Sequence, residues 1–229
     1  MSEAVRAMFS EIAPKYDISN TVLSAGIHHR WRTKAVKLSG AKAGDSVLDC
    51  ATGTGDLIIA FGKVVGKNGT LLGTDFCSPM MDTAPEKAQK NGLVIKFQEA
   101  DVMNLPYSDN SFSIASIGFG IRNVDDPRKG LSEMARVVKS GGKVVVLEFG
   151  QPNGIFGKIF QWYSVNILPI IGGILTGKKD AYSYLQKTSA QFPCREEFVD
   201  IMDKTGQFSH ISYTPVTGGI AYIYIGTVA

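Results

Sequence analysis

The sequence predicts an α/β protein with a doubly wound, mostly parallel β-sheet that ends in an antiparallel hairpin. Short apolar runs alternate with helical patterns between residues 46 and 150, as expected for parallel strands joined by helices. The run at 143–150 includes three consecutive valines, which is typical of a strand buried on both faces. The short connection between the apolar runs at 208–216 and 218–228 predicts the hairpin.

The elements follow in order along the chain. Residues 1–40 have helical patterns and precede the first strand. Ser78 and Pro79 are expected to begin the helix after the second strand, and Pro85 to kink or shorten it. Strands are expected at 46–50, 70–76, 94–100, 112–119 and 143–150, and helices at 56–65, 80–91, 126–138 and 195–206, with 139–142 ending the third of these helices.

Composition limits the classes of function. The chain has 229 residues, of which 44% are hydrophobic, so a packed core is expected and wholesale disorder is not. A net charge of +3 is too small to predict a nucleic-acid interface. Three cysteines without a C-x-x-C pair predict reduced thiols and no metal site, and the first residues lack the apolar region of a signal peptide. We therefore expect a cytoplasmic protein.

The central feature is the stretch SVLDCATGTGD at 46–56, which reads as a strand, a glycine turn and a helix start. Such a turn brings backbone N–H groups close to a ligand. Ala51 replaces the first glycine of a dinucleotide fingerprint, and no third glycine follows Gly55. The carboxylates of Asp49 and Asp56 would repel a pyrophosphate and favour a cationic ligand with an amino group and a sulfonium. A plain strand-to-helix turn is the alternative.

Further polar residues and glycines fall at the predicted strand ends. Asp75 lies 20 residues after Gly55, which is the spacing of an acidic residue that binds ribose hydroxyls. A turn or N-cap aspartate is the alternative. Asp101 and Val102, after the third strand, are placed to bind an adenine ring. Because parallel strands end at one edge of a sheet, these residues and the stretch 118–123 should share one pocket.

Two other stretches are ambiguous. Basic residues surround Trp31 in IHHRWRTKAVKL, which fits either a surface for anionic headgroups or a solvated helix with Trp31 turned inward. Residues 151–195 interrupt the alternation with an apolar segment whose lysine, proline and paired glycines argue against a membrane span. We expect a cap over the site with an apolar face, and the alternative is a helical elaboration of the core.

Four stretches resemble class I S-adenosylmethionine-dependent methyltransferases, and more closely the family that C-methylates polyprenyl quinols in menaquinone and ubiquinone synthesis. They are FSEIAPKYDISNTVLSAGIHHRWR, LDCATGTGD, LPYSDNSF with IGFGIRNVDDP, and, more weakly, SYLQKTSAQFP. The resemblance covers nearly the whole chain. It implies a Rossmann-like class I methyltransferase sheet and one domain, 1–229, with a helical lid (1–40), a cofactor-binding core (41–150), an apolar substrate cap (151–195) and a final helix and hairpin (196–229).

The resemblance also implies S-adenosyl-L-methionine as cofactor, and no metal. Gly53 and Gly55 would shape the turn, and Gly118 would lie along the methionine end of the cofactor. Gly118 stands where relatives of the ubiquinone branch often have serine, so no hydroxyl contact is expected there. Pro85 departs from the unbroken helix usual in relatives. The residues predicted to contact the cofactor directly are Asp49, Thr54, Asp75, Phe76, Asp101 and Val102.

Three residues are predicted to be catalytic: Arg122, Asn123 and Tyr16. Arginine stays protonated in proteins, so Arg122 is expected to stabilise a phenolate or position a water. Asn123 would orient the same oxygen, and Tyr16 with Asp17 would close over the ring. The structural alternatives are a salt bridge of Arg122 to a neighbouring aspartate at 125 or 126, a helix cap for Asn123 and core packing for Tyr16.

We therefore predict C-methylation of a polyprenyl quinol, with demethylmenaquinol as the acceptor. The alternatives are methylation of 2-methoxy-6-polyprenyl-1,4-benzoquinol in ubiquinone synthesis and a non-catalytic, prenyl-quinone-binding pseudo-methyltransferase. The acidic turn and the missing third glycine argue against a dinucleotide oxidoreductase. The expected partner is the prenylated quinol, and peripheral contact with the inner face of the cell membrane and a homodimer are left open.

Overall fold

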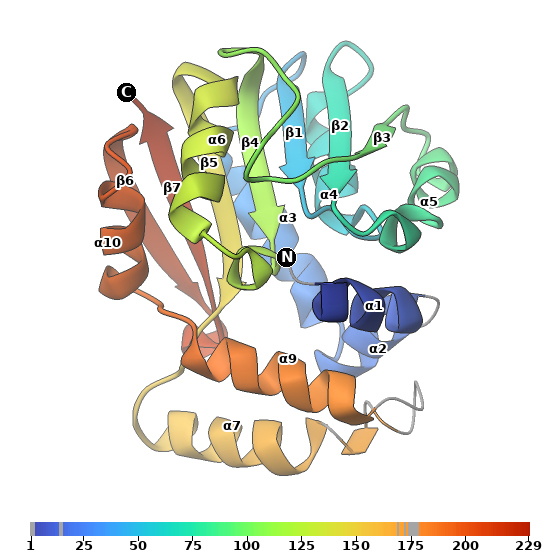
Figure 1. The fold of residues 1–229 in the computed structure, drawn as a ribbon, viewed down its shortest axis with the longest axis vertical. Helices are drawn as coiled ribbons and strands as arrows, with labels where there is room; N and C mark the ends of the chain where they lie inside the picture. The colour runs from blue at the N-terminus through green and yellow to red at the C-terminus, as the bar shows by residue number, and fades with distance from the viewer. Residues whose placement is uncertain (1–2, 14–15, 169, 172, 174–178) are drawn as a thin grey trace.

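The computed structural model of the chain describes residues 3–13, 16–168, 170–171, 173 and 179–229. Within these residues, seven strands form one sheet in the order β3-β2-β1-β4-β5-β7-β6 (Figure 1). The neighbours from β3 to β5 pair in parallel, and β7 pairs antiparallel with both β5 and β6. The strands are β1 (Ser46–Cys50), β2 (Thr70–Asp75), β3 (Lys96–Glu99), β4 (Phe112–Gly118), β5 (Val138–Phe149), β6 (Phe208–Val216) and β7 (Ala221–Val228).

Helices cover both faces of the sheet. On one face, α3 (Ile27–Ser39) and α4 (Asp56–Val65) bury Val36 and Phe61 against the central strands. On the other, α6 (Pro127–Val137) and α10 (Glu196–Asp203) bury Met134 and Phe198. The short helix α5 (Ala84–Lys90) packs beside β3 at the edge of the sheet (Figure 1). The predicted doubly wound sheet with its terminal hairpin is confirmed.

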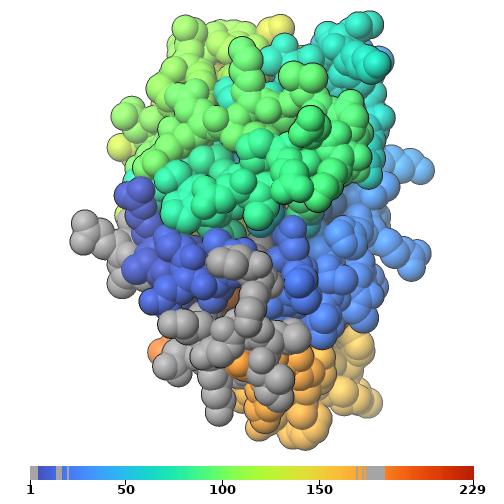
Figure 2. All heavy atoms as spheres, turned by 90° about the vertical axis from the view of Figure 1, so that its right-hand side faces the viewer, coloured from blue at the N-terminus to red at the C-terminus, as the bar shows by residue number. Residues whose placement is uncertain are grey.

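A layer of helices lies beyond the carboxyl ends of the parallel strands (Figure 1). It contains α1 (Glu3–Ile12), α2 (Tyr16–Leu23), α7 (Gly154–Asn166) and α9 (Lys179–Gln191). Phe9 and Ile12 of α1 pack against Cys77 and Met80, with Leu185 of α9 beside them. The N-terminal helices form a band between the core and α7 (Figure 2). None of the described helices is both long and apolar enough to cross a membrane.

Two expected boundaries are wrong. A separate 3₁₀ helix, Ser78–Met81, follows Cys77 as its N-cap, so the helix expected from Ser78 is divided. Pro85 stands in the first turn of α5, where a backbone N–H has no acceptor within the helix, so proline loses no helical hydrogen bond there. The expectation that Pro85 shortens the helix is confirmed. β5 begins at Val138 rather than 143 and directly follows α6, because a register shift against β4 at Phe112 accommodates the extra residues.

Candidate active site

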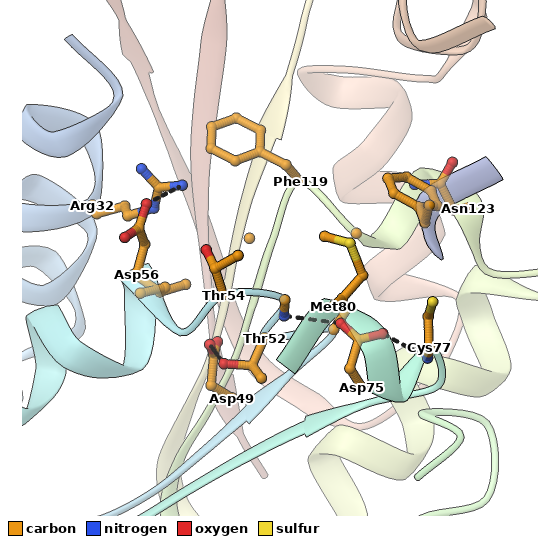
Figure 3. Close-up of a pocket in the computed structure, with 16 residues that line it drawn as sticks. Arg32, Asp49, Thr52, Thr54, Asp56, Asp75, Cys77, Met80, Phe119 and Asn123 are labelled. Atoms are coloured by element: carbon orange, nitrogen blue, oxygen red, sulfur yellow. Dashed lines mark hydrogen bonds and ion pairs between the residues drawn. The ribbon is translucent and has the colours of Figure 1, made fainter. Parts of the chain in front are cut away.

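A cavity opens at the carboxyl ends of β1, β2 and β4 (Figure 3). Its lining combines the turn after β1, the residues after β2, the stretch after β4, and Phe9 and Arg32 from the N-terminal helices. Gly55 is the N-cap of α4 and is not part of the lining. The predicted site residues that do line the cavity are Asp49, Gly53, Thr54, Asp75, Gly118 and Asn123.

Asp49 supplies the most buried carboxylate of this lining. It lies next to the carboxyl end of β1 and is only 1% exposed. The hydroxyls of Ser116 and Thr52 donate to its two oxygens, at 2.6 and 2.7 Å. Burial raises the pKa of Asp49 to about 6, although these hydrogen bonds oppose the shift. The side chain is therefore an acceptor whose negative charge is poorly solvated, and it favours a nearby cation.

Asp75 is held by the backbone of the glycine turn. Gly53 N–H donates to one of its carboxylate oxygens at 2.9 Å, and Cys77 N–H donates to the other at 2.8 Å (Figure 3). Burial nevertheless raises the pKa of Asp75 above its usual value. Gly53 has φ +53°, a left-handed conformation that suits glycine. The turn thus fixes the orientation of the carboxylate at the tip of β2.

Ala51 explains how the turn forms without a first glycine. It adopts φ +48°, in the left-handed region that is uncommon for alanine. Its methyl group faces Gly120, where an added Cβ would lie 2.6 Å from the Ala51 Cβ. The glycine after β4 therefore provides the space that the side chain at 51 requires.

A polar network joins the N-terminal helices to the turn. The Thr54 hydroxyl donates to Asp17 of α2 at 2.5 Å, and Lys87 Nζ lies 2.6 Å from the same carboxylate. Lys87 also pairs with Asp56. Burial alone would raise the pKa of Asp56, but the nearby cations lower it below its usual value. Tyr16 begins α2, but its side chain lies outside the described residues, so its predicted role stays a prediction.

Arg32 is a lining residue that sequence reasoning did not place in the site. It lies 3.2 Å from Asp56 and only 8% of it is exposed (Figure 3). Trp31 is buried beside it, and its indole N–H donates to Thr217 at 2.8 Å. The interpretation of Trp31 as an interfacial residue is therefore wrong, and the alternative with Trp31 turned inward is correct. The pairing of Arg32 with Asp56, which opens α4, is a tertiary contact that the sequence did not signal.

Arg122 lies next to the cavity but does not line it. Its Nη1 is 2.7 Å from Glu148 of β5 and donates to the Phe119 carbonyl at 2.5 Å. The side chains of this ion pair are 4% and 2% exposed, and the guanidinium also stacks on Phe149. Glu148, rather than either of the aspartates considered from the sequence, is thus its partner in this ion pair. Arg122 Nε and Asn123 Oδ1 are buried without a hydrogen-bond partner among the described residues.

The remaining predicted contacts lie on the same edge of the sheet but outside this cavity lining. Asp101 follows β3, which pairs with β2, and its carboxylate accepts from Met103 N–H at 2.9 Å. Val102 is buried in the core beneath α6. The ring of Phe76 stacks with Arg6 of α1. The structure therefore brings Asp49 and Asp75 into one cavity and leaves Asp101 beside it.

One group of side chains has the spacing of metal ligands. Atoms of His28, His29 and Asp56 lie within 4.8 Å of one another. Asp56 already pairs with Arg32 and Lys87. Burial, and to a smaller extent the positive charge of Arg32, lowers the pKa of His28 to about 4. A metal ion would have to compete with two fixed cations, so the arrangement favours ion pairing over metal binding.

The profile of the ubiE/COQ5 methyltransferase family matches residues 1–228. The chain belongs to this family. A Bdellovibrio bacteriovorus protein named ubiquinone/menaquinone biosynthesis C-methyltransferase UbiE is 62% identical over 227 residues, covering 99% of this chain and 96% of that protein. A Thermus thermophilus demethylmenaquinone methyltransferase is 43% identical over 220 residues, covering 96% and 99%.

Solved methyltransferases share the fold of this family member. A S-adenosylmethionine-dependent methyltransferase from Thermotoga maritima has a TM-score of 0.68 at 20% identity, covering 97% of this chain and 99% of that one. One from Methanococcus maripaludis has a TM-score of 0.67 at 21% identity, covering 96% and 93%. The predicted enzyme class and cofactor are confirmed: the protein is a S-adenosylmethionine-dependent methyltransferase. The roles of individual site residues stay predictions.

Proposed function

We propose that this methyltransferase transfers a methyl group from S-adenosylmethionine to a ring carbon of a polyprenyl quinol, with demethylmenaquinol as the main acceptor. The names of its relatives support this acceptor class. The structural observation that carries the proposal is the shared cavity, in which Asp49 and Asp75 of the cofactor half face the stretch that ends at Asn123.

The donor set fits the cofactor. Asp75, oriented by two backbone N–H groups, would accept from the ribose hydroxyls. Asp49 would pair with the amino group of the methionine end, and Arg32, which also lines the cavity and pairs with Asp56, would offer a positive charge to the carboxylate of that end. Thr54, now bonded to Asp17, connects this half of the site to the N-terminal helices. When bound, S-adenosylmethionine supplies an electrophilic methyl group on a sulfonium.

The acceptor half would orient and activate the quinol. Asn123 lines the cavity and has a buried, unpaired carboxamide oxygen. Next to it, the Arg122 guanidinium is fixed by Glu148 and Phe119 and retains an unpaired N–H at Nε. The Arg122 Nε–H would donate to one quinol oxygen and stabilise it as a phenolate after its proton passes to water, which makes the adjacent ring carbon electron-rich. Asn123 Oδ1 can only accept, so it would orient a quinol hydroxyl that keeps its proton. The ring carbon would take the methyl group as the S–CH₃ bond breaks, S-adenosylhomocysteine would leave, and the ring proton would pass to water. Alignment of that carbon with the transferred methyl group can lower the barrier by roughly 7–11 kcal/mol.

A methyl-transfer assay tests the proposal. Purified protein is incubated with methyl-labelled S-adenosylmethionine and either reduced demethylmenaquinone or the 2-methoxy-6-polyprenyl-1,4-benzoquinol. We expect labelled menaquinol, and the benzoquinol is the second candidate because relatives are named for both pathways. If neither quinol is methylated while calorimetry shows that the protein binds S-adenosylmethionine, the proposal fails and the non-catalytic alternative is favoured.

The proposed acceptor dissolves in lipid, so we also propose that the enzyme works in peripheral contact with a membrane. Membrane contact would let the quinol ring enter the cavity without moving the polyprenyl tail through water. The helices beyond the strand ends lie between the cavity and the outer end of the molecule (Figure 1). A homodimer stays a prediction.

A further inference from the structure

The helix α7 exposes the side chains that a soluble helix normally buries. Ile155, Ile159 and Trp162 are 79%, 61% and 62% exposed, and their spacing of four and three residues places them on one face. The residues of α7 that are buried against the protein are instead Gly157 and Ser164. A surface helix of a globular protein usually has the opposite arrangement, with its apolar stripe inward.

This exposure is concentrated at one end of the molecule. Eleven large hydrophobic residues of the described chain are exposed, and seven of them belong to α2 and α7 of the helical layer beyond the strand ends. Besides those on α7, they include Ile18 and Val22 of α2. Figure 1 places α7 as the outermost element of this layer, with α9 between it and the sheet. The outermost helix of the layer thus carries most of the exposed large apolar side chains of this end of the molecule.

The charge of the chain around α7 indicates what covers the exposed apolar side chains of this helix. Between Glu148 and Asp180 the sequence has three lysines, Lys158, Lys178 and Lys179, and no acidic residue. Lys158 is exposed on α7 itself. An apolar helix with an exposed lysine, a tryptophan and no acidic residue has features of helices that lie in the interface of anionic bilayers. A second copy of the chain would instead bring two positively charged faces together.

We propose that the exposed face of α7, formed by Ile155, Phe156, Ile159, Trp162 and Val165, docks on an anionic lipid bilayer. The inference rests on the proposed lipid-soluble acceptor and assigns the membrane contact to one helix face. Docking by α7 would set the helical layer against the bilayer and keep the cofactor-binding core in water. The quinol ring could then pass from the lipid through the helical layer to the cavity.

Vesicle sedimentation with the full chain tests the docking face. The assay contains no quinol, so that binding to the lipid is measured separately from binding of the acceptor. We expect the wild type to bind phosphatidylcholine vesicles that contain phosphatidylglycerol and to bind pure phosphatidylcholine less. Ile159→Ser with Trp162→Ser should lower partitioning at least about tenfold, since each large apolar side chain contributes roughly 1.5–3 kcal/mol on burial. Lys158→Glu should weaken binding to the anionic vesicles alone. The control is Val64→Ser with Val94→Ser. It removes two exposed apolar side chains that lie outside the helical layer, and it should bind like the wild type.

Fluorescence of the wild type gives an independent readout. The chain has two tryptophans, and Trp31 is already buried, so a blue shift on adding vesicles would report Trp162. The proposal is overturned if the wild type ignores anionic vesicles, or if the double variant binds as well as the control. It is also overturned if sedimentation velocity without lipid shows a dimer that the double variant abolishes. Calorimetric titration with S-adenosylmethionine verifies that each variant is folded, and the methyl-transfer assay judges the proposed function separately.

Discussion

Asp49→Asn should separate the stability of this protein from its affinity for the cofactor. The carboxyl has a pKa of about 6 in the folded protein, against 3.8 for an ordinary aspartate, because it is buried. Each unit of difference corresponds to 1.36 kcal/mol, so the ionised carboxylate costs the folded state about 3 kcal/mol at neutral pH. Asparagine has the same shape, and the hydroxyls of Thr52 and Ser116 can rotate to meet its amide.

The sign of the effect follows from proton binding. Between about pH 4 and 6 the folded protein binds more protons at Asp49 than the unfolded chain, so this carboxyl makes stability fall as the pH rises through that window. The neutral variant lacks this dependence. Its free energy of unfolding should exceed that of the wild type by up to about 3 kcal/mol at pH 7.5, and the gain should vanish below pH 4. Urea denaturation at several pH values measures both quantities.

Cofactor binding should change in the opposite direction. If Asp49 pairs with the amino group, its loss should weaken binding of S-adenosylmethionine roughly tenfold to hundredfold, the effect of a hydrogen bond to a charged group. Asp203→Asn, at an exposed position of α10, is the matched control and should change neither quantity. A variant that binds the cofactor like the wild type would refute the assigned partner. A variant destabilised equally at pH 4 and pH 7.5 would refute the energetic argument.

Four further substitutions test neighbouring parts of the site. Asp75→Ala should weaken S-adenosylmethionine binding in calorimetry before it affects turnover, by roughly tenfold to hundredfold. Arg122→Ala should leave that affinity unchanged and lower kcat by orders of magnitude, and unaltered kcat would remove Arg122 from the mechanism. Glu148→Gln leaves a buried guanidinium without its counter-charge, so urea denaturation should show a loss of about 3–5 kcal/mol. Gly120→Ala should destabilise by about 1–3 kcal/mol through its contact with the side chain at 51, and Ala51→Gly in the same chain should restore the loss.

The parts of the site that follow from local patterns were predictable. The turn that carries Asp49 and Gly53 was marked by its glycines, and the order of strands placed Asp75 at the same edge. The pairing of Arg122 with Glu148 was not predictable, because it depends on β4 and β5 lying side by side and two aspartates stand closer in sequence. Distance along the chain is a poor guide to ion pairs that cross a sheet.

Arg32 shows a second limit. A charged residue on a helix with basic neighbours is usually solvated, and nothing in α3 alone distinguishes Arg32 from Arg30. Its burial follows from the packing of α3 against α4, which brings it to Asp56. The helix boundary at Pro85 was predictable from the chemistry of proline, whereas the separate 3₁₀ helix before it was not. Tertiary contacts decided both of the ion pairs that sequence reasoning missed, Arg32 with Asp56 and Arg122 with Glu148.

The strand order has a consequence for synthesis on the ribosome. β7 is the last strand of the sheet in the chain, yet it lies between β5 and β6 and pairs with both. While the nascent chain is still short of residue 221, β6 has no neighbour to pair with and one side of β5 stays open. An unpaired strand edge promotes aggregation, so protection by a chaperone should matter most in the final moments of translation.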